Sequence, residues 1–122
     1  MITIENNISA TRARINNAAD TYDRKRSTIS LLAVSKKQSV EAIQQAVAAG
    51  LIDFGENYLQ EAEQKIQQLQ SLNLIWHYIG AIQSNKTQTI ARLFDWVHSV
   101  DRIKIAKRLS DQRPVDMPPL NI

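Results

Sequence analysis

The stretch Leu31-Leu32-Ala33-Val34-Ser35-Lys36-Lys37 decides the fold of this chain. Four apolar residues precede a small polar residue and two lysines, and a segment with helical spacing starts at Ser39. A short apolar run bounded by polar residues is typical of a buried strand, so we predict a strand over residues 29–35. A strand that leads into a helix is the first half of a βαβ unit, the unit from which parallel sheets are built.

Lys36 stands at the end of this predicted strand and is the first candidate functional residue. In parallel α/β folds, the functional groups lie at the carboxyl ends of the strands. Apolar walls or neighbouring cations favour the neutral amine of a lysine, and a neutral amine can attack a carbonyl carbon to form an imine. The alternative is a solvated lysine, which is common just past a strand and is our interpretation of Lys37.

The composition is that of a globular protein. The chain has 122 residues, of which 43% are hydrophobic and 22% are charged, so it is one ordinary domain or part of a larger one. It contains no cysteine, which excludes disulfides and thiolate metal sites within this sequence.

Charge and hydropathy predict neither a nucleic-acid partner nor a membrane partner. The net charge is only +3, and the short basic cluster at residues 24–26 is typical of a solvated turn. Residues 1–10 lack the basic and apolar regions of a signal peptide, and no apolar run approaches the ~20 residues that cross a bilayer. We therefore expect a cytoplasmic protein.

A rhythm of strands and helices runs along the rest of the chain. A helix is predicted over residues 2–20, and further strands over residues 51–55, 74–80 and 94–100, each followed by a helix. The residues expected to cap these helices are Ser39, Asn57 with Gln60, Ser84 or Asn85, and Asp101, with Gly50 ending the helix after Ser39. Residues 113–119 are a predicted loop, and residues 120–122 are the predicted start of a fifth strand.

Repeated βα units predict an α/β fold with a parallel sheet, either as a barrel or as an open sheet. A (β/α)8 barrel of the TIM type needs eight units, and this sequence contains four and the start of a fifth. We therefore expect residues 1–122 to be the amino-terminal half of a single barrel domain. Its outer strand edges and inward side chains would be open, which favours self-association.

Few residues outside the strand ends can carry chemistry. With three glycines the chain has no glycine-rich phosphate loop. His77 and His98 lie on different predicted strands, with no carboxylate at metal-ligand spacing, so no metal site is predicted. Polar residues remain at the strand ends, and structural interpretations exist for them: Asn57 as a helix cap and His77 as a hydrogen-bonded core histidine. The segment at residues 84–86 is a helix start, although helix N-termini also bind phosphate.

Five motifs, in order along the chain, resemble the pyridoxal phosphate homeostasis protein family. They are residues 31–36 (LLAVSK), 54–61 (FGENYLQE), 76–80 (WHYIG), 83–86 (QSNK) and 110–114 (SDQRP), and the resemblance spans essentially the whole chain. Members look like single-domain βα barrels similar to the amino-terminal domain of alanine racemase. The resemblance implies that pyridoxal 5′-phosphate forms an imine with Lys36, and that Asn57 and His77 stand at the barrel mouth. It also implies a protein that carries or buffers the cofactor for vitamin B6 homeostasis without turnover, and hence no enzyme.

Length separates this chain from the family it resembles. Members are about twice as long, and their phosphate-binding groups and the arginine near the pyridine nitrogen lie in later strands. An imine without a phosphate clamp is open to water, so we expect this polypeptide alone to bind the cofactor weakly or not at all. Two alternatives remain: a remnant without a ligand, and a racemase-like enzyme, which would need an acid/base pair on the two faces of the cofactor ring.

Overall fold

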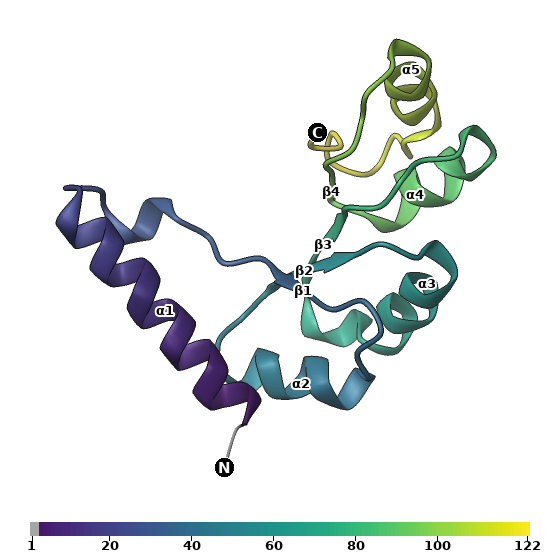
Figure 1. Ribbon diagram of the computed structural model, residues 1–122. Helices are drawn as coiled ribbons and strands as arrows, with labels where there is room; N and C mark the ends of the chain where they lie inside the picture. Colours follow the sequence, from purple (N-terminus) through teal and green to yellow (C-terminus); the bar gives the residue numbers. More distant parts are fainter. Residues whose placement is uncertain (1–2) are drawn as a thin grey trace.

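The computed structural model describes residues 3–122, which form five α-helices and a four-stranded sheet (Figure 1). The elements are α1 Ile4–Thr21, η1 Arg26–Thr28, β1 Ala33–Val34, α2 Val40–Ala48, β2 Asp53–Glu56, α3 Leu59–Gln68, η2 Gln70–Leu72, β3 Ile75–Tyr78, η3 Ser84–Lys86, α4 Thr87–Leu93, β4 Trp96–Val97 and α5 Ile103–Gln112. The predicted first helix is confirmed, although its expected first residue, Ile2, lies outside the described residues. None of these helices is long and apolar enough to span a membrane.

The strands lie in the order β1-β2-β3-β4, and every neighbouring pair is parallel. Trp96 of β4 also forms a parallel bridge with Asn121, which confirms the predicted start of a fifth strand. Strands in consecutive order, each followed by a helix, follow the winding of a βα barrel, whereas the order reverses in a doubly wound sheet. The fold is therefore that of the first four βα units of a (β/α)8 barrel.

The two faces of the sheet are covered differently. In Figure 1 the helices α3 to α5 lie on the right of the strands, α2 lies below them and α1 lies on the left. Alternate strand residues that face α2 to α5 are buried in the apolar core: Phe54, Trp76, Tyr78 and Val97. The other strand residues point to the opposite face, which would be the inside of a barrel. Val34 on that face is 50% exposed, so this face is partly open.

Arg113 fastens the carboxyl-terminal segment to α4. Its guanidinium donates hydrogen bonds to the carbonyls of Ala91 (2.7 Å) and Phe94 (2.6 Å), at the end of that helix, and to Pro118 (2.9 Å). A cation at a helix C-terminus satisfies carbonyls that have no partner within the helix. The arginine of the SDQRP motif therefore holds the fifth-strand segment in place.

The predicted helix starts were only partly correct. Ser39 is the N-cap of α2 and accepts a hydrogen bond from the Ala42 amide at 3.0 Å, as predicted. Asn57 was wrong as a cap, because the chain is still extended at Tyr58, which is the N-cap of α3. Ser84 or Asn85, and Asp101, were wrong for a similar reason: a 3₁₀ turn precedes α4, and extended backbone at Arg102 precedes α5.

The length of the first strand also needs correction. The first strand is shorter than residues 29–35, because pairing with β2 is confined to Ala33 and Val34. Ile103 begins α5 and is 88% exposed, because the helical rotation turns Ile105 and Leu109 toward the core instead.

Candidate functional site

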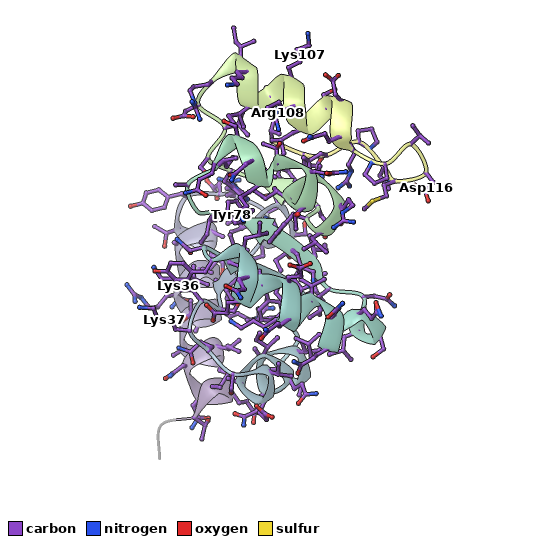
Figure 2. All side chains as sticks on the ribbon, turned by 90° about the vertical axis from the view of Figure 1, so that its right-hand side faces the viewer. Lys36, Lys37, Tyr78, Lys107, Arg108 and Asp116 are labelled. Atoms are coloured by element: carbon purple, nitrogen blue, oxygen red, sulfur yellow. The ribbon has the colours of Figure 1, made fainter. Side chains whose placement is uncertain are left out.

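Lys36 lies in a tight turn at the carboxyl end of β1. The Ser35 amide donates to the Gly55 carbonyl at 2.9 Å, and the Gln38 amide closes the turn by donating to the Ser35 carbonyl at 3.0 Å. Both lysines of the turn are exposed and project from the same edge of the molecule (Figure 2). The Lys37 ammonium lies 5.8 Å from the centre of the Tyr58 ring, whereas the Lys36 side chain makes no polar contact with the described residues.

Lys36 and Asn57 follow the ends of neighbouring strands. Val34 pairs with Gly55, and the Ser35 amide donates to the Gly55 carbonyl, so the ladder between β1 and β2 ends just before Lys36. Both residues therefore lie at the carboxyl end of the sheet, where parallel α/β folds carry their functional groups.

Asn57 carries a buried acceptor without a partner. Its side-chain oxygen Oδ1 makes no hydrogen bond with the described residues, which leaves the cost of burying a polar atom uncompensated. Asn57 lines a cleft of about 630 Å³ together with Tyr58, Gln83 and Lys86. Lys36 is not among the residues that line this cleft, so the described chain presents its amine to solvent and not to an enclosed cavity.

Gly80 allows the chain after β3 to approach Asn57. A Cβ atom at Gly80 would lie 2.3 Å from the Asn57 carbonyl oxygen, which is far closer than non-bonded atoms come. Only glycine leaves room for this approach, so Gly80 lets the chain after β3 pack against the backbone of Asn57.

His77 belongs to a chain of three polar side chains. Its Nε2 lies 2.8 Å from Asp53 Oδ1, and its Nδ1 lies 2.9 Å from His98 Nε2. If the Asp53 carboxylate accepts from Nε2, Nδ1 becomes an acceptor and the His98 ring must donate. The Trp96 ring stacks on His77, with the ring centroids 5.7 Å apart. Burial, and then the neighbouring His77, lower the pKa of His98.

Sequence reasoning missed Asp53, because the carboxylate comes from β2 and only the strand register brings it to His77. Both nitrogens of the buried His77 ring are engaged, which leaves neither free for a ligand in this arrangement. Residues 3–122 hold no group of three or more His, Cys, Asp or Glu side chains arranged to bind a metal ion.

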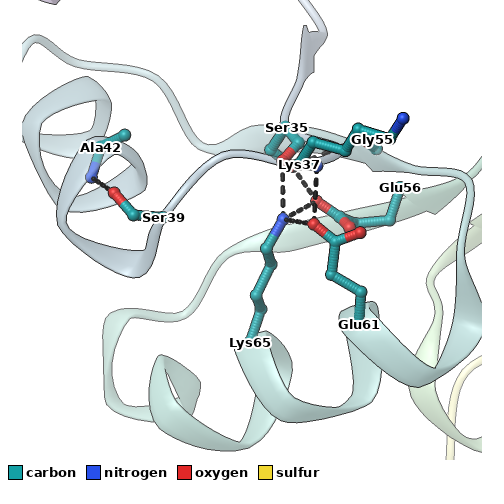
Figure 3. Close-up of polar contacts among 8 residues, drawn as sticks. All are labelled: Ser35, Lys37, Ser39, Ala42, Gly55, Glu56, Glu61 and Lys65. Atoms are coloured by element: carbon teal, nitrogen blue, oxygen red, sulfur yellow. Dashed lines mark hydrogen bonds and ion pairs between the residues drawn. The ribbon is translucent and has the colours of Figure 1, made fainter.

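A buried ionic cluster lies between the Lys36 turn and α3 (Figure 3). We call it the turn network; its residues are Ser35, Glu56, Glu61 and Lys65. Lys65 Nζ donates to the Ser35 carbonyl (2.6 Å), to Glu61 Oε1 (2.8 Å) and to Glu56 Oε2 (3.0 Å). The Ser35 hydroxyl also donates to Glu56 Oε2, and the Lys37 amide donates to Glu61 Oε1 at 2.6 Å. The hydrogen bond from Lys65 is the main cause that lowers the pKa of Glu61.

The turn network was not predicted from the sequence. Glu56 is fully buried and Lys65 is 5% exposed, although glutamate and lysine are rarely buried without a partner. The spacing of Glu61 and Lys65, four residues apart on one helix, was the available signal.

The three predicted site residues therefore occupy two levels of the sheet. Lys36 and Asn57 lie at the strand ends, and His77 lies one layer deeper, level with Gly55 and Val34. Their contacts with a cofactor stay predictions.

Comparison with known proteins identifies close relatives. The pyridoxal phosphate homeostasis protein of Pseudomonas aeruginosa is 58% identical over 122 residues, which are 100% of this chain and 53% of the relative. The protein of the same name from Escherichia coli K12 is 48% identical over 122 residues, covering 98% of this chain and 52% of the relative. The chain thus spans about half the length of these curated relatives. No protein-family model matches the sequence.

Solved structures resemble the fold. PipY of Synechococcus elongatus PCC7942, solved with PLP bound, matches with a TM-score of 0.69 and 40% identity, over 80% of this chain and 47% of PipY. An unknown protein from Bifidobacterium adolescentis matches with a TM-score of 0.79 and 28% identity, over 89% of this chain and 49% of that protein.

Proposed function

We propose, since this chain belongs to the pyridoxal phosphate homeostasis protein family, that it binds pyridoxal 5′-phosphate at Lys36 and serves vitamin B6 homeostasis without catalytic turnover. The observation that carries this proposal is the position of Lys36: an exposed amine at the carboxyl end of the first parallel strand, in a turn held on both sides. The PLP-bound relative, at 40% identity, supports the choice of ligand.

The residues at the strand ends fit the aldehyde end of this cofactor. Pyridoxal 5′-phosphate supplies an aldehyde that condenses with amines and a ring that withdraws electrons. The Lys36 amine would add to the aldehyde carbon, and loss of one water molecule would leave a carbon–nitrogen double bond. The unpartnered Oδ1 of Asn57, at the same end of the sheet as Lys36, could accept a hydrogen bond from a ligand there. His77, held by hydrogen bonds to Asp53 and His98, would lie one layer below the ligand and support the site.

We further propose that this chain by itself holds the cofactor weakly. The Lys36 side chain is exposed and lies outside the cleft lined by Asn57, so water has free access to the nitrogen. An imine open to water hydrolyses readily, and no charge or hydroxyl of the described residues contacts the Lys36 side chain to hold a ligand there.

An absorbance titration of the 122-residue chain with pyridoxal 5′-phosphate tests the proposed site. We expect an imine band that grows with ligand without reaching saturation at low concentrations and that is lost in Lys36→Ala but kept in Lys107→Ala. Equal bands in the parent and in Lys36→Ala would contradict the assignment of Lys36. A saturable band that Lys36→Ala abolishes would confirm the site and show that binding is tighter than we propose.

A second assay tests the absence of turnover. We expect α-deuterated amino acids to lose no more deuterium to solvent with the parent and cofactor than with Lys36→Ala and cofactor. Faster loss with the parent would favour the racemase-like alternative, which requires an acid and a base beside the ring.

A further inference from the structure

We infer that Lys65 and Glu61 are positioning residues for Lys36: they fix the two peptide groups that flank it and thereby set where its amine stands. This inference rests on the proposed function of Lys36 and deepens it. It concerns the turn network drawn in Figure 3, whose members lie on β2, on α3 and at the end of β1.

The contacts of the turn network converge on the backbone around Lys36. On its amino-terminal side, the Ser35 carbonyl accepts from Lys65 Nζ at 2.6 Å. On its carboxyl-terminal side, the Lys37 amide donates to Glu61 Oε1 at 2.6 Å. These two contacts are joined, because Lys65 Nζ also donates to Glu61 Oε1 at 2.8 Å. One ammonium and one carboxylate thus hold both neighbours of Lys36.

The backbone held in this way is not one that the chain adopts by default. Lys37 has a φ of 60°, in the left-handed region that side chains with a Cβ disfavour. Such a conformation persists when the surroundings impose it, and residues held like this cluster at functional sites. Two hydrogen bonds hold it here: the Lys37 amide donates to Glu61 Oε1, and the Gln38 amide donates to the Ser35 carbonyl.

Stability alone gives no reason to bury these charges. Removing two charges from water is costly, and buried ion pairs can often be replaced by apolar side chains without loss. The ammonium is fully used, because the three N–H donors of Lys65 meet three acceptors. Glu56 Oε2 accepts hydrogen bonds from both Lys65 Nζ and the Ser35 hydroxyl. A buried cluster whose ammonium spends all three donors around one turn indicates that the geometry of that turn matters.

The Lys36 side chain takes its direction from the backbone of the turn. It makes no polar contact of its own with the described residues, so the backbone direction alone decides where the amine begins. Reactive groups lose much of their rate when misplaced by about 1 Å, by a factor of about 100. Supporting residues that lock a reactive group are therefore part of a working site.

Two variants of Glu61 test the inference. Glu61→Ala removes the acceptor of the Lys37 amide, whereas Glu61→Gln keeps an oxygen that can accept. Glu63→Ala, on the same helix and without a contact to the turn, is the matched control. Each full chain is incubated with pyridoxal 5′-phosphate and borohydride, which reduces the carbon–nitrogen double bond to a stable amine. Peptide mass spectrometry then gives the ratio of pyridoxyl label on Lys36 to label on the exposed Lys107.

We expect Glu61→Ala to lower this ratio by about 10-fold or more, Glu61→Gln to stay close to the parent, and Glu63→Ala to equal the parent. A folded Glu61→Ala with the parent's ratio would overturn the positioning role. The double variant Lys65→Met/Glu56→Gln removes the buried Glu56 carboxylate together with its cation. It repeats the test on the contact between Lys65 and the Ser35 carbonyl. It should lower the ratio similarly, and an unchanged ratio would also overturn the inference.

Failure of the proposed function has a different signature. If the parent labels Lys36 no more than Lys107, the binding role of Lys36 is wrong, and the positioning role is overturned with it. If the parent labels Lys36 selectively and every network variant does the same, the binding role stands and only the positioning role is overturned.

Discussion

Removing the Lys65 ammonium should destabilise the fold strongly, because it would leave the Glu56 carboxylate buried without a cation. Glu56 is fully buried, and its Oε2 lies 3.0 Å from Lys65 Nζ, while its Oε1 has no partner among the described residues. Lys65→Met keeps most of the aliphatic packing and removes the charge and its three hydrogen bonds. Breaking one side of a buried pair costs about 3–5 kcal/mol, a large part of the roughly 5–15 kcal/mol that stabilises a domain.

Urea unfolding followed by circular dichroism measures this cost. With a slope of about 2 kcal/mol per molar urea, a loss of about 4 kcal/mol lowers the midpoint by about 2 M. Lys107→Met, on the exposed face of α5, is the control and should change the stability by less than about 0.5 kcal/mol. If Lys65→Met is unfolded without urea, its cost exceeds the total stability of the parent.

The double variant Lys65→Met/Glu56→Gln completes a cycle. Because it removes the buried Glu56 carboxylate together with its cation, it should be more stable than Lys65→Met alone, with a coupling of about 2–3 kcal/mol between the two sites. A Lys65→Met midpoint within error of Lys107→Met, or additive costs in the double variant, would refute the claim that the two charges depend on each other.

Three further outcomes follow from contacts elsewhere in the chain. Gly80→Ala should cost about 1–3 kcal/mol in urea unfolding, because the new Cβ would lie 2.3 Å from the Asn57 carbonyl oxygen. Gly50→Ala, at a φ of 98° with nothing within 4 Å, should cost only about 1 kcal/mol from backbone strain, and a cost as large as that of Gly80→Ala would contradict the clash. Arg113→Leu should lose about 2 kcal/mol or more, since three carbonyls lose a charged donor; an unchanged thermal midpoint would refute its fastening role. Burial, and then the neighbouring histidine, hold the pKa of His98 below its ordinary 6.5, so the unfolded chain binds more protons as the pH falls. The neutral His98 therefore contributes to the free energy of unfolding above pH 6.5, and this contribution is lost as the pH falls toward the lowered pKa. His98→Gln should flatten the plot of unfolding free energy against pH in that range, and an unaltered slope would contradict this account.

The sequence predicted the order of elements because their signals are local. Apolar runs such as residues 31–34 and the helical stripes between them marked every βα unit, and Ser39 marked the start of α2 correctly. Strand lengths and several caps were less predictable, since pairing across the sheet decides where a strand ends. Asn57 resembled a cap by residue type and spacing, but the path of the chain put Tyr58 there.

The candidate site was predictable only in part. Lys36 could be proposed because a lysine after a strand is visible in a single segment. The partners of His77 could not, because Asp53 and His98 come from other strands and meet it through the register. The burial of Lys65 was also hidden, since its spacing from Glu61 signals an ion pair on α3 but not that the lysine is buried.

Mapping the lysines that borohydride fixes to pyridoxal 5′-phosphate tests the central claim most directly. We predict that, at limiting cofactor, label on Lys36 exceeds label on Lys37 and Lys107 of the same molecules, and that the excess disappears when the chain is unfolded in urea. Label spread evenly over exposed lysines in the folded chain would contradict the claim that Lys36 captures the cofactor.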